Sequence, residues 1–223
     1  MPYGRRRLFA ALMAAFVFVW ALRATVFYDA VDSAFPAGSP RIWFGLLVKL
    51  FLWTGAAAAY AHWVRHEPPL RALRVTTPLG YRHLGSAVVV AAVFLAGVTW
   101  DVCRRGDLSV VALWKAALTR GLVVLAWTLL AALVEETFFR GLVLRELSEH
   151  LRFWPANFAN ATLFLLVHLP YWLWNRGLDI AVVRDSAGVF MIALVLGYLT
   201  RQTGSIWPAT VTHALNNLLT QAL

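Results

Sequence analysis

The chain is divided into long apolar blocks, and the length of these blocks limits the folds that it can adopt. Several blocks approach the about 20 residues that an α-helix needs to cross the hydrocarbon core of a bilayer. In lipid every backbone amide must be satisfied within the protein, which leaves helices as the natural form for blocks of this length. We therefore predict an all-α fold, a polytopic transmembrane helix bundle of about six to seven spans. The candidate spans are residues 8–28, 42–64, 84–101, 121–147, 155–174, 186–200 and 205–223.

The segments between the blocks are short. Residues 108–120, which include Trp114 and Lys115, suit either an interfacial helix or the start of the fourth span. Residues 65–83, with three prolines, form the one substantial polar connector. No segment is long and polar enough for a soluble domain. We therefore predict a single integral membrane domain over residues 1–223.

The composition excludes two other classes of protein. Hydrophobic residues make up 61% of the chain and charged residues only 14%, whereas a soluble domain is closer to half apolar and a quarter charged. The net charge of +9 would suit a nucleic-acid partner, but the basic residues are scattered singly between apolar blocks. No compact basic face or recognition motif is present, so we expect a lipid bilayer as partner and no nucleic acid.

Arginines alternate with acidic residues from one loop to the next. The N-terminus and the loops after the second, fourth and sixth candidate spans are rich in arginine, while the intervening loops hold aspartates. By the positive-inside rule the N-terminus is cytoplasmic, with the pair Arg104 and Arg105 as the exception. The chain has 20 basic residues, of which only Lys49 and Lys115 are lysines. This preference for arginine suggests a GC-rich bacterial genome, and we expect the bacterial inner (cell) membrane as the location.

Two adjacent glutamates, Glu135 and Glu136, lie inside an apolar block. A carboxylate at membrane depth is costly, so an ionisable residue there indicates a functional site. Glu136 and Arg140 are four residues apart on a helix and can pair, whereas Glu135 is rotated by about 100° and is left to face a cavity. A helix end with both glutamates in water is the alternative, but apolar residues continue through 141–144.

Two histidines also lie in apolar sequence, His168 just before a proline and His213 in a later block. Asn217 is four residues after His213 and shares its helical face. At 1.5 Å per residue, Glu135, His168 and His213 all lie about 12–20 Å from the same membrane face. We predict that these three residues and Asn217 line one cavity that opens to the cytoplasmic side.

These polar residues resemble the motifs of a known family. Residues 135–140 (EETFFR) resemble its EExxxR motif, residues 164–168 (FLLVH) its FxxxH motif, and residues 213–217 (HALNN) its HxxxN motif. The family is the CPBP family (CAAX protease and bacteriocin-processing, or Abi) of intramembrane endopeptidases, which includes the type II prenyl-protein endopeptidases. The resemblance covers about residues 120–220, so we divide the domain into N-terminal helices (1–119) and a motif-bearing catalytic core (120–220).

The resemblance implies a role for each matching residue in hydrolysis of a peptide bond near the terminus of a membrane-associated protein or peptide. Glu135 would be the general base that activates water, and His168 would help to hold that water. His213 and Asn217 would stabilise the oxyanion of the tetrahedral intermediate. Glu136 and Arg140 would orient the site.

A metal ion is not required by this glutamate mechanism. Glutamate and histidine are nevertheless zinc ligands, and Glu135, His168 and His213 are the candidates if zinc takes part. No HExxH motif occurs in the chain.

Two other functions remain open from the sequence. Cys103 stands beside two arginines in the loop after the third span and would suit a cysteine-type sorting peptidase. Alternatively, the polar residues could serve binding in a non-enzymatic membrane scaffold or immunity protein. The sequence does not identify a substrate, so prenylated and non-prenylated membrane proteins or peptides both remain open.

Overall fold

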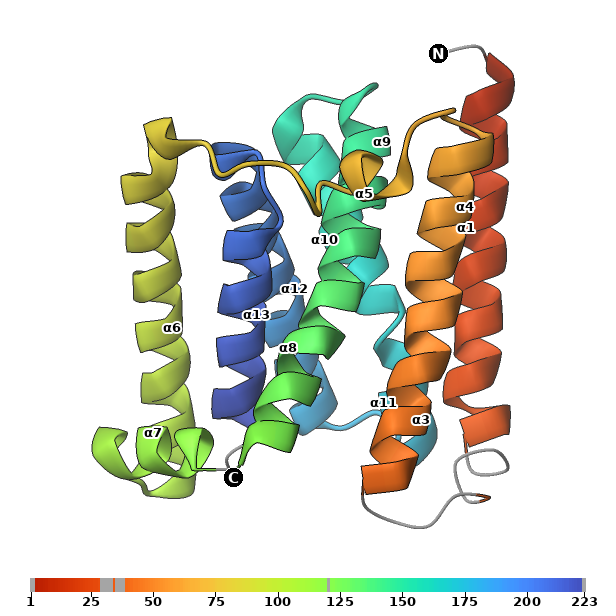
Figure 1. Cartoon of the computed structure of the whole chain (residues 1–223). Helices are drawn as coiled ribbons and strands as arrows, with labels where there is room; N and C mark the ends of the chain where they lie inside the picture. The colour runs from red at the N-terminus through yellow and green to blue at the C-terminus, as the bar shows by residue number, and fades with distance from the viewer. Residues whose placement is uncertain (1–2, 29–33, 35–38, 120, 222–223) are drawn as a thin grey trace.

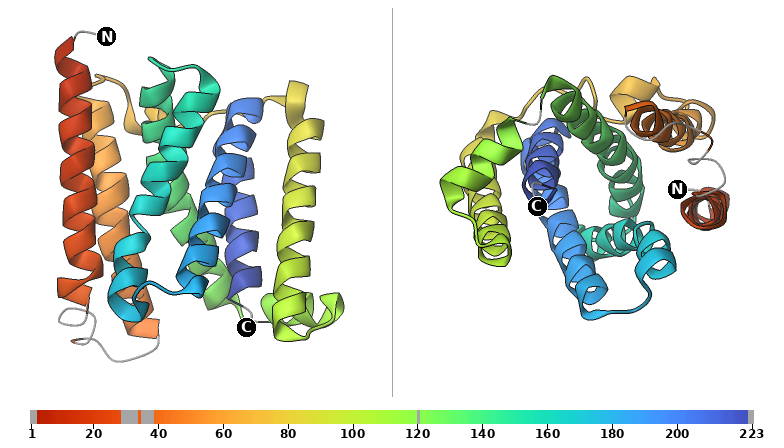
Figure 2. Two further views of the ribbon diagram at one scale, coloured as in Figure 1. Left: turned by 180° about the vertical axis from the view of Figure 1, so that it is seen from behind. Right: turned by 90° about the horizontal axis from the view of Figure 1, so that it is seen from below.

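The computed structural model describes residues 3–28, 34, 39–119 and 121–221, and these residues form a bundle of long helices (Figure 1). No strand occurs in these ranges, which confirms the all-α prediction. Helices α1, α3–α4, α6, α8–α9, α10, α12 and α13 run up and down the bundle, while α7 lies across one end of α6 (Figure 2). The elements are α1 (Tyr3–Ala24), α3 (Ser39–Lys49), η1 (Leu50–Gly55), α4 (Ala56–Trp63), α5 (Pro69–Ala72), η2 (Tyr81–His83), α6 (Leu84–Gly106), α7 (Val110–Leu118), α8 (Leu122–Glu136), η3 (Thr137–Val143), α9 (Leu144–Ser148), α10 (Phe153–Leu166), α11 (Leu169–Arg176), α12 (Ile180–Thr203) and α13 (Trp207–Thr220).

Five helical stretches in the described residues are long and apolar enough to cross a membrane. They are residues Gly4–Ala24, Trp43–Trp63, Tyr81–Gly106, Leu122–Ser148 and Ile180–Thr203. The predicted spans at 155–174 and 205–223 are shorter helices instead, because α10 ends at Leu166 and α13 has 14 residues. The protein is thus a helical membrane bundle of about six spans.

The region 108–120 forms a separate helix, α7, rather than the start of the fourth span. Ser109 caps α7, since its side-chain oxygen accepts a hydrogen bond from the backbone N–H of Ala112. Gly121 has a φ of 86°, a left-handed conformation that suits glycine and separates α7 from α8. The segment is therefore not the start of the fourth span, and its interfacial position stays a prediction.

Apolar side chains cover the outside of the bundle as well as its interior. Phe51, Val93, Leu122 and Ile180 are each more than 65% exposed, with Leu122 and Ile180 at 84%. Large exposed apolar surfaces are rare on soluble monomers but are required where helices face lipid. The largest buried cluster surrounds Trp53 and joins α1, α3, η1 and α4 to α8, η3 and α10.

Helix α10, which carries one of the three motifs, packs closely against α12. Asn157 of α10 donates from Nδ2 to the Leu194 carbonyl of α12 at 2.9 Å. A Cβ at Gly197 would lie 1.9 Å from Oδ1 of Asn157, so no larger residue fits there. Helices α8 and α13 also pack against each other, which places all three motifs around one interior region.

Candidate active site

The two glutamates stand at the point where α8 changes to the π-helix η3. Helix α8 ends at Glu136 and η3 begins at Thr137. A second π-helix, η1, begins directly after Lys49. The two π-helices touch through the hydroxyls of Thr54 and Thr137, 3.4 Å apart. π-Helical turns are rare and frequent at functional sites, because the extra residue in the turn redirects side chains.

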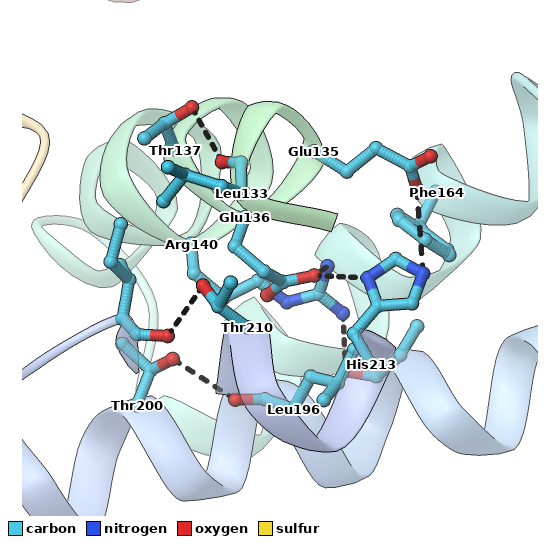
Figure 3. A network of polar contacts seen from close by, with 12 residues as sticks. Leu133, Glu135, Glu136, Thr137, Arg140, Phe164, Leu196, Thr200, Thr210 and His213 are labelled. Carbon is cyan, nitrogen blue, oxygen red and sulfur yellow. Dashed lines mark hydrogen bonds and ion pairs between the residues drawn. The ribbon is translucent and has the colours of Figure 1, made fainter. Parts of the chain in front are cut away.

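Glu136 is fully buried and forms the centre of a polar cluster with Glu135, Arg140 and His213, here called the mid-bundle cluster (Figure 3). Its Oε1 accepts hydrogen bonds from Nη1 of Arg140 at 3.0 Å and from Nδ1 of His213 at 2.8 Å. The predicted pairing of Glu136 with Arg140 is therefore confirmed. The pair uses one guanidinium nitrogen, because Nη2 of Arg140 donates to the Ala193 carbonyl of α12 at 2.9 Å.

Arg140 connects three helical elements in the interior of the bundle. Its side chain is 0% exposed and its guanidinium carbon lies 4.8 Å from the ring centre of Phe164 in α10. Together with the bond to Ala193, this contact joins η3 to α10 and α12. A buried cation with a carboxylate, a carbonyl and an aromatic face as partners is well compensated, which explains how it is tolerated in an apolar interior.

Glu135 lies on the other side of the His213 ring from Glu136 (Figure 3), as its predicted rotation away from Glu136 requires. Its Oε2 is 3.7 Å from Nε2 of His213, beyond a direct hydrogen bond, and has no hydrogen-bond partner among the described residues. Its Oε1 accepts a hydrogen bond from Nζ of Lys49. Glu135 therefore keeps one carboxylate oxygen available for a further donor.

Lys49 is the site residue that the sequence reasoning missed. Its ammonium pairs with Glu135 and lies 4.6 Å from the ring centre of Trp53. The signal was present, because Lys49 is one of two lysines in the chain and falls inside the predicted span 42–64. The rule that singled out the glutamates, that a charge at membrane depth indicates function, applies equally to this lysine.

His168 occupies the break between α10 and α11. Its Nδ1 is 2.7 Å from the carbonyl oxygen of Phe164, so Nδ1 carries the proton and Nε2 is left for another partner. The ring centre of Phe164 lies 4.8 Å from that of His168 and 5.8 Å from that of His213. The three motifs are thus brought to one region by α8, α10 and α13.

Asn217 is not part of the mid-bundle cluster's hydrogen bonds. Its side-chain oxygen accepts a hydrogen bond from Asn216 at 3.3 Å. The residue is partly buried one turn after His213 on α13, so it shares the helical face that the sequence predicts. Its predicted contact with an oxyanion stays a prediction.

A cavity of about 250 Å³ adjoins Lys49 and His168. Of the four residues predicted to line one cavity, His168 alone borders this one. The cavity lies where α1 ends and α3 begins, away from the N-terminal end of the bundle, whereas we expected an opening on the N-terminal side (Figure 1). The break after α10 at His168 turns this side chain toward that half of the bundle. The lining residues are Trp20, Arg23, Ala24, Tyr28, Gly45, Lys49, Trp53, Val167, His168, Tyr171 and Trp172.

The candidate zinc ligands Glu135, His168 and His213 are not gathered into a metal-ligand group in the structure. No three histidine, cysteine, aspartate or glutamate side chains in the described ranges form a group that could hold a metal ion. Lys49 and Arg140 instead place cationic groups on the two glutamates. A cation that ligates Glu135 would have to displace the Lys49 ammonium.

Cys103 lies in a helix rather than in the predicted loop, because α6 continues to Gly106. Its side chain is buried among Val102, Leu113 and Leu219. Buried cysteines in apolar surroundings are generally inert, so this position gives no support to the cysteine-type peptidase.

Comparison with known proteins agrees with the motifs. The family model of type II CAAX prenyl endopeptidase Rce1-like proteins matches residues 117–219, which confirms the resemblance over the region that carries all three motifs. A search of curated proteins and a search of solved structures found no match. The family match implies a membrane-embedded protease.

Proposed function

We propose that this protein is an intramembrane endopeptidase that hydrolyses a peptide bond near the terminus of a membrane-associated protein or peptide. The observation that carries the proposal is the buried pair Glu135 and Glu136 on either side of His213, within the segment that matches the prenyl endopeptidase family. We place the protein in the bacterial inner membrane with its N-terminus in the cytoplasm, as the distribution of arginines favours.

Glu135 is the general base in this proposal. Its Oε2 has no partner among the described residues and can accept a proton from water. The oxygen of that water attacks the carbonyl carbon of the substrate, and the proton moves to Glu135. When the C–N bond breaks, Glu135 returns the proton to the leaving amine, so the carboxylate is regenerated.

The neighbouring residues position this chemistry. Lys49 supplies a positive charge that favours the ionised carboxylate of Glu135, and Nε2 of His168 is available to hold the attacking water. Glu136 and Arg140 fix His213 through its Nδ1. Donation from His213 to an oxyanion then requires protons on both ring nitrogens, and Asn217 would be the second donor.

The mechanism needs no metal ion in our proposal, since a base, a positioned water and oxyanion donors supply the required groups. Zinc binding by Glu135, His168 and His213 would be the rival arrangement. Purified protein treated with a zinc chelator should keep its activity, and loss of activity that added zinc restores would support the rival.

Comparison of membrane proteomes tests the function directly. A strain that lacks the gene is complemented with the wild-type protein, with Glu135→Gln, or with Glu149→Gln as a control carboxylate outside the mid-bundle cluster. We expect membrane proteins with an uncleaved terminus to accumulate in the deletion strain and with Glu135→Gln, but not with Glu149→Gln. A scaffold or immunity protein would instead be restored by Glu135→Gln, because the change keeps the shape of the side chain.

A further inference from the structure

A second cavity lies at the N-terminal end of the bundle, far from the end where α11 is found. It has a volume of about 440 Å³, within the range of ligand pockets. It is formed where residues 64–80, here called the strap, cross the bundle next to α9 (Figure 1). The lining residues are Glu67, Pro68, Arg71, Arg74, Thr77 and Arg145.

The cavity has an excess of positive charge, with three arginines and one glutamate in its lining. Glu67 is already paired, since its carboxylate accepts hydrogen bonds from Arg145 at 2.9 Å and from Arg65 at 3.1 Å. Arg71 and Arg74, by contrast, make no side-chain hydrogen bond or ion pair with any part of the chain that the structure describes. Two guanidinium groups are therefore left without an anion.

Arg74 adopts a backbone conformation that is unusual for an arginine. Arg74 follows the end of α5 with a φ of 59°, the left-handed conformation in which glycine is the usual residue. Burial, reinforced by the charge of Arg145, also lowers the pKa of Arg74. Strain of this kind is commonly retained where the side chain has a function. An anion in the cavity would stabilise the charged form of the Arg74 guanidinium, which burial and Arg145 disfavour.

The cavity lies at the depth of the lipid headgroups. The strap joins the end of one candidate span at Trp63 to the start of the next at Tyr81. These two aromatic side chains are 71% and 81% exposed. Exposed tryptophan and tyrosine at span ends mark the interface between the hydrocarbon core and the headgroups. The anion that is abundant at this depth is the phosphate of a phospholipid.

We propose that this cavity binds the phosphate group of an anionic phospholipid through Arg71 and Arg74. Arginine presents a planar set of donors that matches phosphate oxygens in a bidentate manner. Arg145 also lines the cavity and is fixed in place by its bonds to Glu67 and to the Ala72 carbonyl, each at 2.9 Å. The site is independent of the proposed hydrolysis.

Lipid binding in this cavity would also affect the helix that carries the two glutamates, because the strap contacts η3. The strap packs so closely on η3 that a Cβ at Gly141 would lie 2.6 Å from the Leu73 carbonyl oxygen. At its other end Gly80 donates its backbone N–H to the Thr203 carbonyl of α12 at 2.8 Å. A lipid held by Arg74 would therefore stabilise the strap against η3 and α12.

Native mass spectrometry of the full-length protein in detergent tests the site, with phosphatidylglycerol and phosphatidylcholine as probes. We expect the wild-type protein to retain phosphatidylglycerol in preference to phosphatidylcholine. Arg74→Gly should weaken this binding about tenfold, the effect of losing one charge-assisted contact. Its melting temperature without lipid should stay the same or rise, because glycine suits the backbone. Arg82→Gln is the matched control, since Arg82 is exposed on η2 outside the cavity.

Several results would overturn the proposal. These are equal binding by Arg74→Gly and wild type, or an equal loss in Arg74→Gly and Arg82→Gln, which would indicate general surface charge. Binding of inorganic phosphate or glycerol 3-phosphate as tight as that of the lipid, with the same dependence on Arg74, would identify a soluble ligand instead. If Arg74→Gly does not accumulate, the exposed Arg71→Gln takes its place with the same expected loss.

Discussion

Two clusters of charged residues differ in how completely their carboxylates are satisfied. The mid-bundle cluster leaves one oxygen of Glu135 and one of Glu136 without a hydrogen-bond partner among the described residues. Near the N-terminal end, Glu146 is surrounded by donors: Arg5 at 2.6 Å, Tyr60 at 3.0 Å and Arg65. We call this second group, which also includes Glu149, the end network.

The difference separates two uses of a buried carboxylate. Glu146 is 1% exposed and both of its oxygens are occupied, so it ties α1 and α4 to α9 but has no oxygen left for a ligand. Glu135 is 4% exposed and keeps an oxygen available beside His213. Unpaired buried acceptors are expensive, and their presence at the family motif points to chemistry rather than to stability.

The largest expected effect comes from comparing the loss of Glu135 in the mid-bundle cluster with the loss of Glu146 in the end network. Glu135→Gln should reduce turnover by at least about 10²–10⁴-fold, the usual effect of removing a general base, and should leave the melting temperature near that of wild type. Glu146→Gln should do the reverse, because it removes an anion from a network of arginines. Turnover is measured with purified protein and a peptide from a substrate found by proteomics. Near wild-type turnover in Glu135→Gln would show that Glu135 is not the base.

Arg140→Ala tests whether the mid-bundle cluster also has a structural part. The change leaves Glu136 buried without its cation, which typically costs about 3–5 kcal/mol of stability. We expect lower expression, a lower melting temperature in detergent and reduced activity. Arg140→Lys should restore these only in part, because an ammonium cannot bond Glu136 and Ala193 with a planar group. An unchanged melting temperature with lost turnover would move Arg140 from positioning to the reaction itself.

Lys49→Met tests whether the two glutamates depend on different cations. Without the ammonium, Glu135 loses its cationic partner while Glu136 keeps Arg140. We expect activity to fall by about 10²-fold through misplacement of the base, with the pH profile of kcat/KM displaced. Lys49→Arg should recover much of the rate. Lys115→Met is the control, since Lys115 lies on α7. Unchanged kinetics in Lys49→Met would remove Lys49 from the site.

The smallest expected effect is the acid sensitivity of the carboxylates at the N-terminal end. Burial raises the pKa of Glu149, but hydrogen bonds and charge from Arg65 outweigh it and bring the pKa below 4.5. A lowered folded-state pKa gives stability that is present above the unfolded value and is lost as the pH falls through the folded one. The melting temperature should therefore decline below about pH 4.5. Glu149→Gln should be less stable at pH 7 and decline less; an equal decline would exclude this contribution.

Much of the fold could be predicted from the sequence, because the length of the apolar blocks determines which segments form spanning helices. The long blocks predict spanning helices, and the structure confirms an all-α membrane bundle. The predicted spans at 155–174 and 205–223 were less accurate, since hydropathy does not report the break at His168 or the 14-residue length of α13. The division into residues 1–119 and 120–220 stays a prediction.

Contacts within the site could be predicted from the sequence only where the spacing along one helix determines them. Four residues on one helix bring Glu136 to Arg140, and the sequence by itself determined that pair, the three motifs and their resemblance to a known endopeptidase family. The tertiary structure decided that His213 lies between the glutamates and that Lys49, 86 residues from Glu135 in the chain, holds the base. It also decided the cavity at the strap, where separate segments place Arg74 and Arg145 together. Helical periodicity determines which residues share a face, whereas contacts between helices depend on how those faces pack.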